Sequence, residues 1–129
     1  MFPEELKYTK SHEYVKAEGS TAVFGISQYA VDQVKDIVYI ELPKIGQEVR
    51  AGFPFGSLES VKAVFELVAP VSGKVVSVNE AINASPDMVT KSPYGEGWMV
   101  KIEISDSSEL NNLLNSVDYK KYTEAEGHH

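Results

Sequence analysis

The stretch LESVKAVFELVAP, residues 58–70, contains two strand-like runs that meet at Lys62. β-Branched and aromatic residues favour strands, and two such runs this close together predict an antiparallel hairpin. Glycine, asparagine and aspartate, which make the usual hairpin turns, do not occur next to Lys62. The sequence therefore predicts a hairpin whose tip presents a long, flexible amine and whose turn has an unusual composition.

Further strand-like runs flank this hairpin on both sides. They lie at residues 22–26, 37–43, 73–81 and 98–105. The segment 44–60 contains three glycines and Pro54, so this part of the chain must turn and bulge more than once. Because no long helix separates the strands, the pattern favours an antiparallel sandwich or flattened barrel over alternating strands and helices.

Helix is predicted at two places only. In residues 27–37, Ser27 is the expected N-cap of a helix with an apolar stripe of Tyr29, Val31, Val34 and Ile37. In residues 105–122, Asp106 and Glu109 have the spacing of a capping box, and the expected packing face is Leu110, Leu113 and Leu114. The predicted fold class is therefore mostly β, with a short helix in the N-terminal half and helices at the C-terminus.

Size and charge limit the classes of partner. The chain has 129 residues, of which 43% are hydrophobic, enough for one domain with a proper core. It contains 19 acidic and 12 basic residues and has a formal charge of -7. This balance argues against nucleic acid and anionic membranes as partners, because both need clustered lysine and arginine. We expect a soluble monomer.

The two ends of the chain carry little functional signal. No apolar run approaches the roughly 20 residues of a membrane span, and the N-terminal sequence lacks the apolar core of a signal peptide. We expect a cytoplasmic protein, or a mitochondrial one if a transit peptide was removed. The last three residues, Gly-His-His at 127–129, resemble a tag remnant, so the expected domain comprises residues 1–126.

The sequence offers little to an ordinary enzyme. It has no cysteine, which excludes disulfides, thiolate zinc sites and protein thiol chemistry. His12 is the only histidine outside the tail, and no nucleophile motif accompanies it. Residues 72–75, SGKV, resemble the end of a phosphate-binding loop, but Val68 and Val75 stand where that motif requires glycine and serine or threonine. No metal-ligand spacing is present, so we expect a protein without catalytic residues.

Lys62 has a setting that differs from that of a solvated surface lysine. Val61 and Ala63 beside it are compact and apolar, and the strands on both sides should hold the tip rigid. A flexible side chain on a rigid turn is the arrangement that a swinging arm requires. Acylation of the amine would lengthen the arm and add the reactive group at the end of the acyl chain.

The motifs around Lys62 match a known family. The segments GISQYA (25–30), DIVYIELPKIG (36–46), FGSLESVKA (55–63) and SPYGEGWMVKIEIS (92–105) resemble the lipoyl-carrying H protein of the glycine cleavage system. The resemblance runs from residue 7 to the last expected helix. Lipoyl domains of 2-oxoacid dehydrogenases usually have aspartate before the lysine, and biotin carriers have methionine on both sides. The triplet Val61-Lys62-Ala63 is the H-protein form.

The resemblance implies a fold and a role. The fold would be a barrel-sandwich hybrid, and Lys62 would carry lipoate through an amide bond. Glycine decarboxylase (P protein) would load an aminomethyl group on the lipoyl arm, aminomethyltransferase (T protein) would remove it, and dihydrolipoyl dehydrogenase (L protein) would reoxidise the dithiol. A lipoate ligase or lipoyl transferase would be a further partner. A chain without cysteine could then take part in sulfur chemistry as a carrier that is not itself an enzyme.

The resemblance also suggests roles for residues around the arm. Glu59 and Gly46 are expected to help a ligase recognise the hairpin, although Gly46 could equally be a plain turn glycine. We expect Ser11, Glu13 and Tyr14, in and beside the family's His-Glu segment, to shelter the loaded arm. Glu66 is expected to join them, because strand alternation places residues 62, 64 and 66 on one face. The carboxylates would face the protonated amine of the arm. The alternative for Glu13 and Glu66 is that both are solvated strand carboxylates.

The chain departs from the family at three places. Tyr14 stands where tryptophan is usual, Lys35 where glycine is usual, and Leu58 where valine is usual. These changes leave open an alternative role as an H-like lipoyl carrier in sulfur oxidation or lipoate relay.

Overall fold

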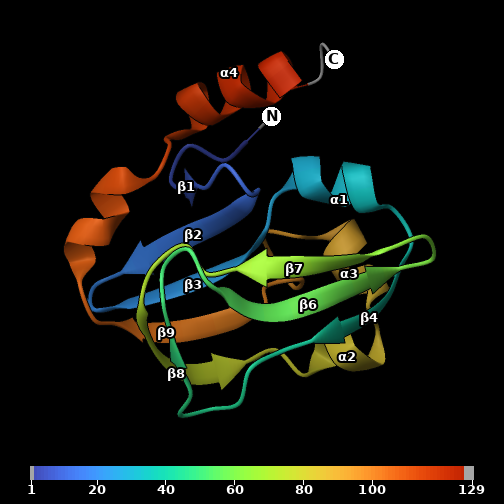
Figure 1. Ribbon diagram of the computed structural model, residues 1–129, viewed down its shortest axis with the longest axis horizontal. Helices are drawn as coiled ribbons and strands as arrows, with labels where there is room; N and C mark the ends of the chain where they lie inside the picture. Colours follow the sequence, from blue (N-terminus) through green and yellow to red (C-terminus); the bar gives the residue numbers. More distant parts are fainter. Residues whose placement is uncertain (1, 127–129) are drawn as a thin grey trace.

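The structure is a computed structural model that describes residues 2–126, so the expected tag remnant at 127–129 lies outside the described residues. Two antiparallel sheets face each other, with short helices at their edges (Figure 1). The larger sheet has the strand order β1-β2-β3-β9-β8-β5, and the smaller has the order β4-β6-β7. This arrangement confirms the predicted mostly β fold.

The bounds of the elements are as follows. The larger sheet contains β1 (Lys7–Tyr8), β2 (Glu13–Glu18), β3 (Thr21–Ile26), β9 (Val100–Ile104), β8 (Gly73–Val78) and β5 (Glu48–Val49). The smaller sheet contains β4 (Ile37–Glu41), β6 (Pro54–Ser60) and β7 (Val64–Val68). The helices are α1 (Gln28–Val34), α2 (Ala81–Ala84), α3 (Asp87–Lys91), the 3-10 helix η1 (Ser107–Asn112) and α4 (Ser116–Glu126).

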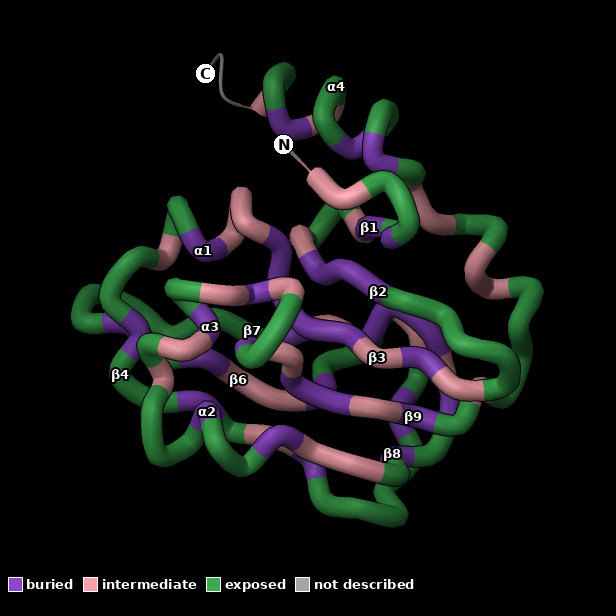
Figure 2. Tube along the Cα trace, turned by 180° about the vertical axis from the view of Figure 1, so that it is seen from behind, coloured by how far each residue is buried: buried purple, intermediate pink, exposed green. Residues whose placement is uncertain are grey.

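Apolar side chains from both sheets fill the space between them. Phe24 of β3 meets Phe55 of β6 edge to face, with ring centroids 5.0 Å apart. In the smaller sheet Leu58 pairs with Ile40 on one side and Phe65 on the other. Figure 2 shows buried residues alternating with less buried ones along the central strands. Each fully buried side chain of this size contributes about 1.5–3 kcal/mol, so this layer fixes the position of both sheets.

A second cluster attaches the C-terminal helix to the N-terminal strands. Tyr8 and Tyr119 are fully buried, and their rings stack with centroids 4.5 Å apart. Tyr8 also exchanges two backbone hydrogen bonds of 2.8 Å with Leu114. The helix α4 is therefore packed against the edge of the larger sheet, where both views place it above β1 and β2 (Figures 1 and 2).

The helix expected over 27–37 is shorter than predicted. Ser27 is the N-cap, as expected, and its hydroxyl accepts a hydrogen bond of 3.3 Å from the N–H of Ala30. The helix ends at Val34 because Lys35 adopts φ +63° and ψ -104°, which α-helix excludes. Ile37 therefore lies in β4 and not on the predicted helical stripe.

Replacing Lys35 by glycine is expected to stabilise the protein. A side chain in a sparsely populated backbone region costs about 1–3 kcal/mol, and the greater freedom of glycine in the unfolded chain offsets part of this gain. We expect a net increase of about 1 kcal/mol in the free energy of unfolding, measured by urea denaturation. Lys35→Ala is the matched control, because it removes the charge and keeps the strain. Equal stability of the two variants would contradict this prediction.

The C-terminal region differs from the predicted capping box. The carboxylate of Asp106 accepts a hydrogen bond of 3.0 Å from the N–H of Ser108, as a cap should. Glu109 does not return the bond, because its carboxylate accepts from both the N–H and the hydroxyl of Ser72, at 2.7 and 2.9 Å. The segment that follows Asp106 is the short 3-10 helix η1, and the bridge at Leu114 separates it from α4.

The prediction that helix occurs at two places only was wrong. Residues 81–91 contain α2 and α3, and the strand expected over 73–81 ends at Val78. Ile82 and Val89 are fully buried, and the side-chain amide of Asn83 donates to the carbonyl of Ile40 at 2.6 Å. Helices of one turn have too few residues to show a helical period, so tertiary packing decides their conformation.

Candidate functional site

Strands β6 and β7 form the predicted hairpin, and Lys62 lies exposed at its tip. The buried hydroxyl of Ser60 accepts hydrogen bonds from the N–H groups of Lys62 and Ala63, at 3.3 and 3.1 Å. The N–H of Val61 donates to the carbonyl of Asp36 at 3.1 Å, which ties the tip to the segment after α1. A serine side chain thus supplies the turn chemistry that the sequence appeared to lack, and serine at the start of a turn was the available signal.

Two hollows lie between this tip and the N-terminal half of the chain. The first, of about 180 Å³, lies beside Lys62, Ser60 and the C-terminal end of α1, and we call it the Lys62 groove. The second, of about 210 Å³, reaches the start of β2, and we call it the Glu13 pocket. Gln33 and Val34 line both. The two hollows are therefore neighbours, and together they lead from the lysine to Glu13.

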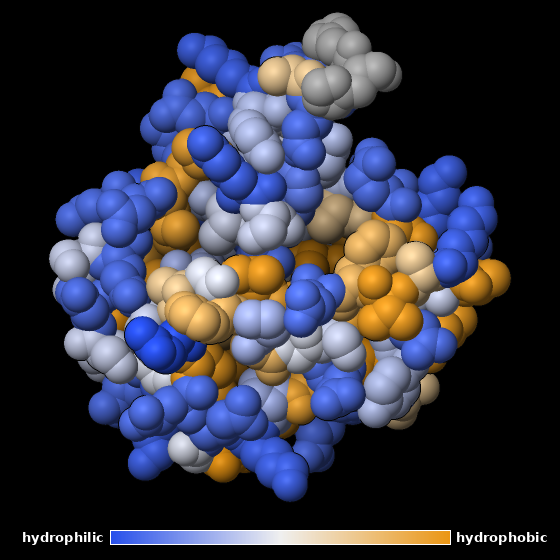
Figure 3. All heavy atoms as spheres, viewed as in Figure 1, coloured by the Kyte–Doolittle hydropathy of each residue, from blue (hydrophilic) through white to orange (hydrophobic). Residues whose placement is uncertain are grey.

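The Glu13 pocket has apolar walls and a polar end. Its apolar lining consists of Ile26, Tyr29, Ala30, Val34, Leu58, Phe65 and Leu67. Its polar lining consists of Ser11, His12, Glu13, Gln33, Glu66 and Glu126. Hydrophobic atoms gather around a hollow below α4 and beside α1 in Figure 3. Such a site accepts a ligand with an apolar stem and a polar end.

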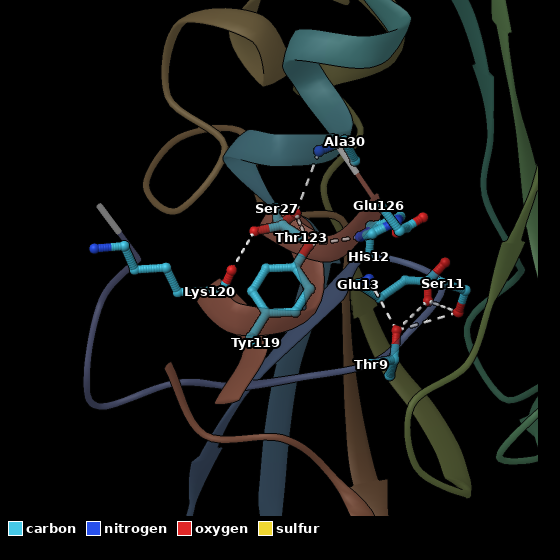
Figure 4. Close-up of polar contacts among 10 residues, drawn as sticks. All are labelled: Thr9, Ser11, His12, Glu13, Ser27, Ala30, Tyr119, Lys120, Thr123 and Glu126. Carbon is cyan, nitrogen blue, oxygen red and sulfur yellow. Dashed lines mark hydrogen bonds and ion pairs between the residues drawn. The ribbon is translucent and has the colours of Figure 1, made fainter. Parts of the chain in front are cut away.

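Glu13 is buried at the polar end of the pocket, with only 2% of its surface exposed. One carboxylate oxygen accepts hydrogen bonds from the hydroxyls of Thr9 and Ser11, at 2.7 and 2.5 Å (Figure 4). The other accepts from the N–H of Val68 at 3.1 Å, which joins β2 to the end of β7. Burial raises the pKa of Glu13, and these hydrogen bonds partly offset that effect. The alternative that Glu13 is a solvated strand carboxylate is therefore wrong.

The other predicted carboxylates are exposed. Glu66 lies on β7 and lines the Glu13 pocket, as does the exposed Ser11. Glu59 lies on β6 between Tyr39 of β4 and Val64 of β7, whose side chains are 51% and 66% exposed. The structure thus brings Ser11, Glu13 and Glu66 to one pocket and places Glu59 on the outer face of the hairpin.

Tyr14 does not line the pocket. Successive side chains of a strand point to opposite faces, so Tyr14 lies on the other face of β2 from Glu13. Its ring packs so closely on Gly25 that a Cβ at that position would lie 3.1 Å from it, and its hydroxyl donates to the carbonyl of Pro93 at 2.7 Å. The expectation that Tyr14 walls the sheltering site is corrected accordingly.

Gly46 does not lie beside Lys62. Its N–H donates to the carbonyl of Val75 in β8 at 2.8 Å, and the loop between β4 and β5 lies at the opposite end of the molecule from the hairpin tip (Figure 1). Its φ of +94° favours glycine, and a Cβ there would meet open space. The structure supports the alternative of a turn glycine over a close-approach position next to the lysine.

A hydrogen-bonded chain that the sequence did not reveal closes the pocket on the side of α4. His12 Nδ1 lies 2.8 Å from the hydroxyl of Tyr119, which lies 2.6 Å from the hydroxyl of Ser27 (Figure 4). His12 Nε2 lies 3.0 Å from the carboxylate of Glu126. Burial lowers the pKa of His12, and the neighbouring Glu126 opposes this effect. His12 and Tyr119 are 107 positions apart, so no local pattern indicates their contact.

Two further classes of site are not found in residues 2–126. No group of three or more histidine, aspartate or glutamate side chains is placed to hold a metal ion. No helix in this part of the chain is both long enough and apolar enough to cross a membrane.

Comparison with known proteins identifies the family. The family described as "Glycine cleavage H-protein" matches residues 6–126. The chain belongs to this family. The glycine cleavage system H protein of Carboxydothermus hydrogenoformans is 51% identical over 125 residues, which cover 97% of this chain and 96% of that protein. The one from Staphylococcus haemolyticus is 54% identical over 119 residues, which cover 92% and 94% of the two chains.

A solved structure agrees with this assignment. The crystal structure of a glycine cleavage system H protein from Mycobacterium marinum superposes with a TM-score of 0.81 at 32% identity, covering 97% of this chain and 98% of that one. This H-protein family member is therefore a non-catalytic lipoyl carrier of the glycine cleavage system, as predicted. Membership of that system implies the P, T and L proteins as partners. The alternative role in sulfur oxidation or lipoate relay finds no support in these relatives.

The residues around Lys62 fit the covalent lipoate of the H-protein family. Lys62 is exposed at a tip that Ser60 and Asp36 hold in place, so its amine is accessible to a modifying enzyme. The Lys62 groove leads past Val34 into a pocket with mostly apolar walls, which suit an alkyl chain and a five-membered disulfide ring. No lysine or arginine occurs among the residues that line the Glu13 pocket in the described chain.

Removing the hydroxyl of Ser60 is expected to loosen the H-protein hairpin tip. In Ser60→Ala, the N–H groups of Lys62 and Ala63 lose their acceptor, at a cost of about 1–2 kcal/mol. We expect the initial rate of lipoylation by a lipoate ligase, followed by mass spectrometry, to fall about threefold to tenfold, because a mobile tip presents the amine less often in one geometry. Ser57→Ala, on the same strand, is the matched control. A variant modified as fast as wild type would show that the Ser60 turn does not position Lys62.

Proposed function

We propose that Lys62 is the residue to which lipoate is attached in this H-protein family member. The proposal is supported by the exposed position of Lys62 at the tip of the β6–β7 hairpin and by the family motif Val61-Lys62-Ala63. Bound lipoate would supply a disulfide that is reduced as one of its sulfurs takes up an aminomethyl group. The dithiol that remains after transfer of this group would then be reoxidised to the disulfide. The protein's own contribution is to present, hold and release this arm.

The Glu13 pocket is the proposed shelter of the loaded arm. The observation that carries this proposal is that Gln33 and Val34 line both the groove beside Lys62 and the pocket that contains Glu13. The apolar walls exclude water from the arm's reactive end, and the hydroxyl of Ser11 and the carboxylate of Glu66 face its protonated amine. Glu13 holds the Ser11 hydroxyl in place through a hydrogen bond and contributes negative charge to the polar end of the pocket.

The outer face of the hairpin is proposed to be read by a lipoate ligase or lipoyl transferase. Glu59 lies three residues before Lys62 in a row with Tyr39 and Val64, so one carboxylate lies between two exposed apolar side chains close to the target amine. This combination gives an enzyme both an apolar contact and a charge for orientation. Gly46 has no part in this surface.

We further propose that the chain acts as one monomeric domain in the cytoplasm. The family match covers residues 6–126 and both sheets share one apolar core, which supports a single domain. One arm must visit three enzymes in turn, which a monomer with its hairpin tip free achieves most simply. The bacterial origin of the H proteins from Carboxydothermus and Staphylococcus supports the cytoplasm.

The proposed path of the arm can be tested by nuclear magnetic resonance. Lipoylation should shift the backbone amide signals of Val34 and Leu67, which line the pocket but lie 28 and five positions from Lys62 in sequence. The amides of Val23 and Ser77, on the larger sheet away from the pocket, should not move. Shifts confined to residues 59–65 would show that the arm remains in solvent and that the sheltering proposal is wrong.

A further inference from the structure

Three carboxylates line the Glu13 pocket, and the C-terminal helix supplies one of them. Glu13 already accepts three hydrogen bonds, and Glu66 is exposed at the rim. Glu126, at the end of α4, is partly buried and lies against His12. No lysine or arginine lines the pocket in the described part of the chain, and His12 is the only basic side chain among the lining residues there.

The hydrogen-bonded chain behind Glu126 fixes where the protons lie. Ser27 caps α1 by accepting the N–H of Ala30, so its own proton is free to go to the hydroxyl of Tyr119. Tyr119 then donates to His12 Nδ1, and the remaining ring N–H is on Nε2, which lies 3.0 Å from Oε2 of Glu126. Within the described residues that carboxylate oxygen is buried and accepts no hydrogen bond. This arrangement gives a neutral imidazole, which agrees with the direction in which burial moves the pKa of His12. Glu126 therefore has a buried carboxylate oxygen that lacks a hydrogen-bond donor, and the neutral ring beside it supplies no compensating charge.

The position of Glu126 is set by packing on both sides of it. The His12 ring lies 4.6 Å from the Tyr29 ring of α1 and 5.9 Å from the Tyr122 ring of α4. The Tyr8–Tyr119 stack holds the body of α4 against β1. His12 itself adopts φ +74°, an uncommon conformation for a residue with a side chain, which the surrounding contacts maintain. A helix end is thus held at the polar end of the arm's pocket.

We infer that Glu126 of α4, oriented by His12, binds the ammonium group of the loaded arm and so makes the C-terminal helix part of the site. This inference rests on the proposed function, in which the arm enters the Glu13 pocket. The loaded arm carries an ammonium group and the empty arm does not. The carboxylate of Glu126 can therefore form an ion pair with the loaded arm alone, and this difference distinguishes the two arms. Glu126 is a specificity residue in this role, and His12 and Tyr119 are positioning residues.

The test uses stable arms of different charge. Because the chain contains no cysteine, the two thiols of the reduced arm are the only thiols in the protein. Alkylation of both with 2-bromoethylamine gives a cationic arm, and alkylation with 1-bromopropane gives a neutral arm of similar length. The readout is amide hydrogen exchange in residues 120–126, together with the amide signals of Val34 and Leu67 as reporters of arm entry.

In wild type, the cationic arm should slow exchange in the last turns of α4 about threefold to tenfold relative to the neutral arm, as expected for a partly exposed ion pair. Glu126→Gln should remove this difference, and Glu126→Asp should restore part of it. Glu124→Gln, an exposed glutamate of the same helix, should leave it unchanged.

Two results would overturn the inference, and they are distinguishable. If both arms move the Val34 and Leu67 signals but α4 exchanges equally with either arm, the arm enters the pocket and the role of Glu126 is wrong. If neither arm moves these signals, the proposed pocket itself is wrong and the inference fails with it.

Discussion

Lys62→Arg is expected to abolish lipoylation, and with it every activity of the protein in a reconstituted glycine cleavage system. A guanidinium stays protonated at any working pH and offers no free amine to an activated acyl group. Lys62 is exposed, so the substitution should change the free energy of unfolding by less than about 0.5 kcal/mol. The measurement is the exchange of the glycine carboxyl carbon with bicarbonate in the presence of the P protein.

Lys35→Arg is the matched control for this substitution. Lys35 lines the same groove as Lys62, so its amine is also available to a modifying enzyme at this end of the molecule. We expect the control to be modified and to support exchange like wild type. Exchange activity that survives in Lys62→Arg and disappears in Lys35→Arg would show that lipoate is attached to Lys35 and not to Lys62.

Glu13→Ala is expected to have the second largest effect, on both stability and retention of the cargo. The substitution leaves the hydroxyls of Thr9 and Ser11 and the N–H of Val68 without their acceptor and opens a buried cavity. We expect the free energy of unfolding to fall by about 2–4 kcal/mol. With Ser11 no longer held, formaldehyde release from the loaded carrier in the absence of the T protein should accelerate about tenfold, while lipoylation remains intact.

The pH dependence of this effect has a defined sign. Burial raises the pKa of Glu13, so the folded protein binds the carboxyl proton more tightly than the unfolded chain does. The stability gained from this tighter binding is complete below the ordinary pKa of a glutamate and is lost as the pH rises through the raised pKa. The difference in stability between wild type and Glu13→Ala should therefore shrink as the pH rises through the raised pKa. Glu18→Ala, an exposed position of the same strand, is the control and should be neutral in both assays. If the loaded wild-type and Glu13→Ala proteins release formaldehyde at equal rates, Glu13 does not shelter the arm.

The hairpin and the lysine at its tip could be predicted because both are local features. The runs on either side of Lys62 contain β-branched and aromatic residues, and their pairing requires only a short turn. The turn itself could not be predicted from the usual signals, because glycine, asparagine and aspartate do not occur next to Lys62. Ser60 performs the same task through its side chain.

The polar end of the pocket could be predicted only in part. Ser11 and Glu13 are neighbours in sequence, and their proximity to Glu66 follows from the pairing of distant segments. The contribution of α4 could not be foreseen, because the contacts of His12 with Tyr119 and Glu126 join the two ends of the chain. The expected roles of Gly46 and Tyr14 depended on the family resemblance alone. Tyr14 lies on the other face of β2 from Glu13, and Gly46 lies in the β4–β5 loop, so neither is part of the site.

The central claim is that Lys62 carries the lipoyl arm, and peptide mapping by mass spectrometry tests it most directly. The unmodified protein is incubated with a lipoate ligase, lipoate and ATP, and the modified peptide is then fragmented. We expect one lipoyl group per chain, on Lys62, although the chain contains eleven lysines. A lipoyl group on any other lysine, or a protein that the ligase leaves unmodified, would contradict it.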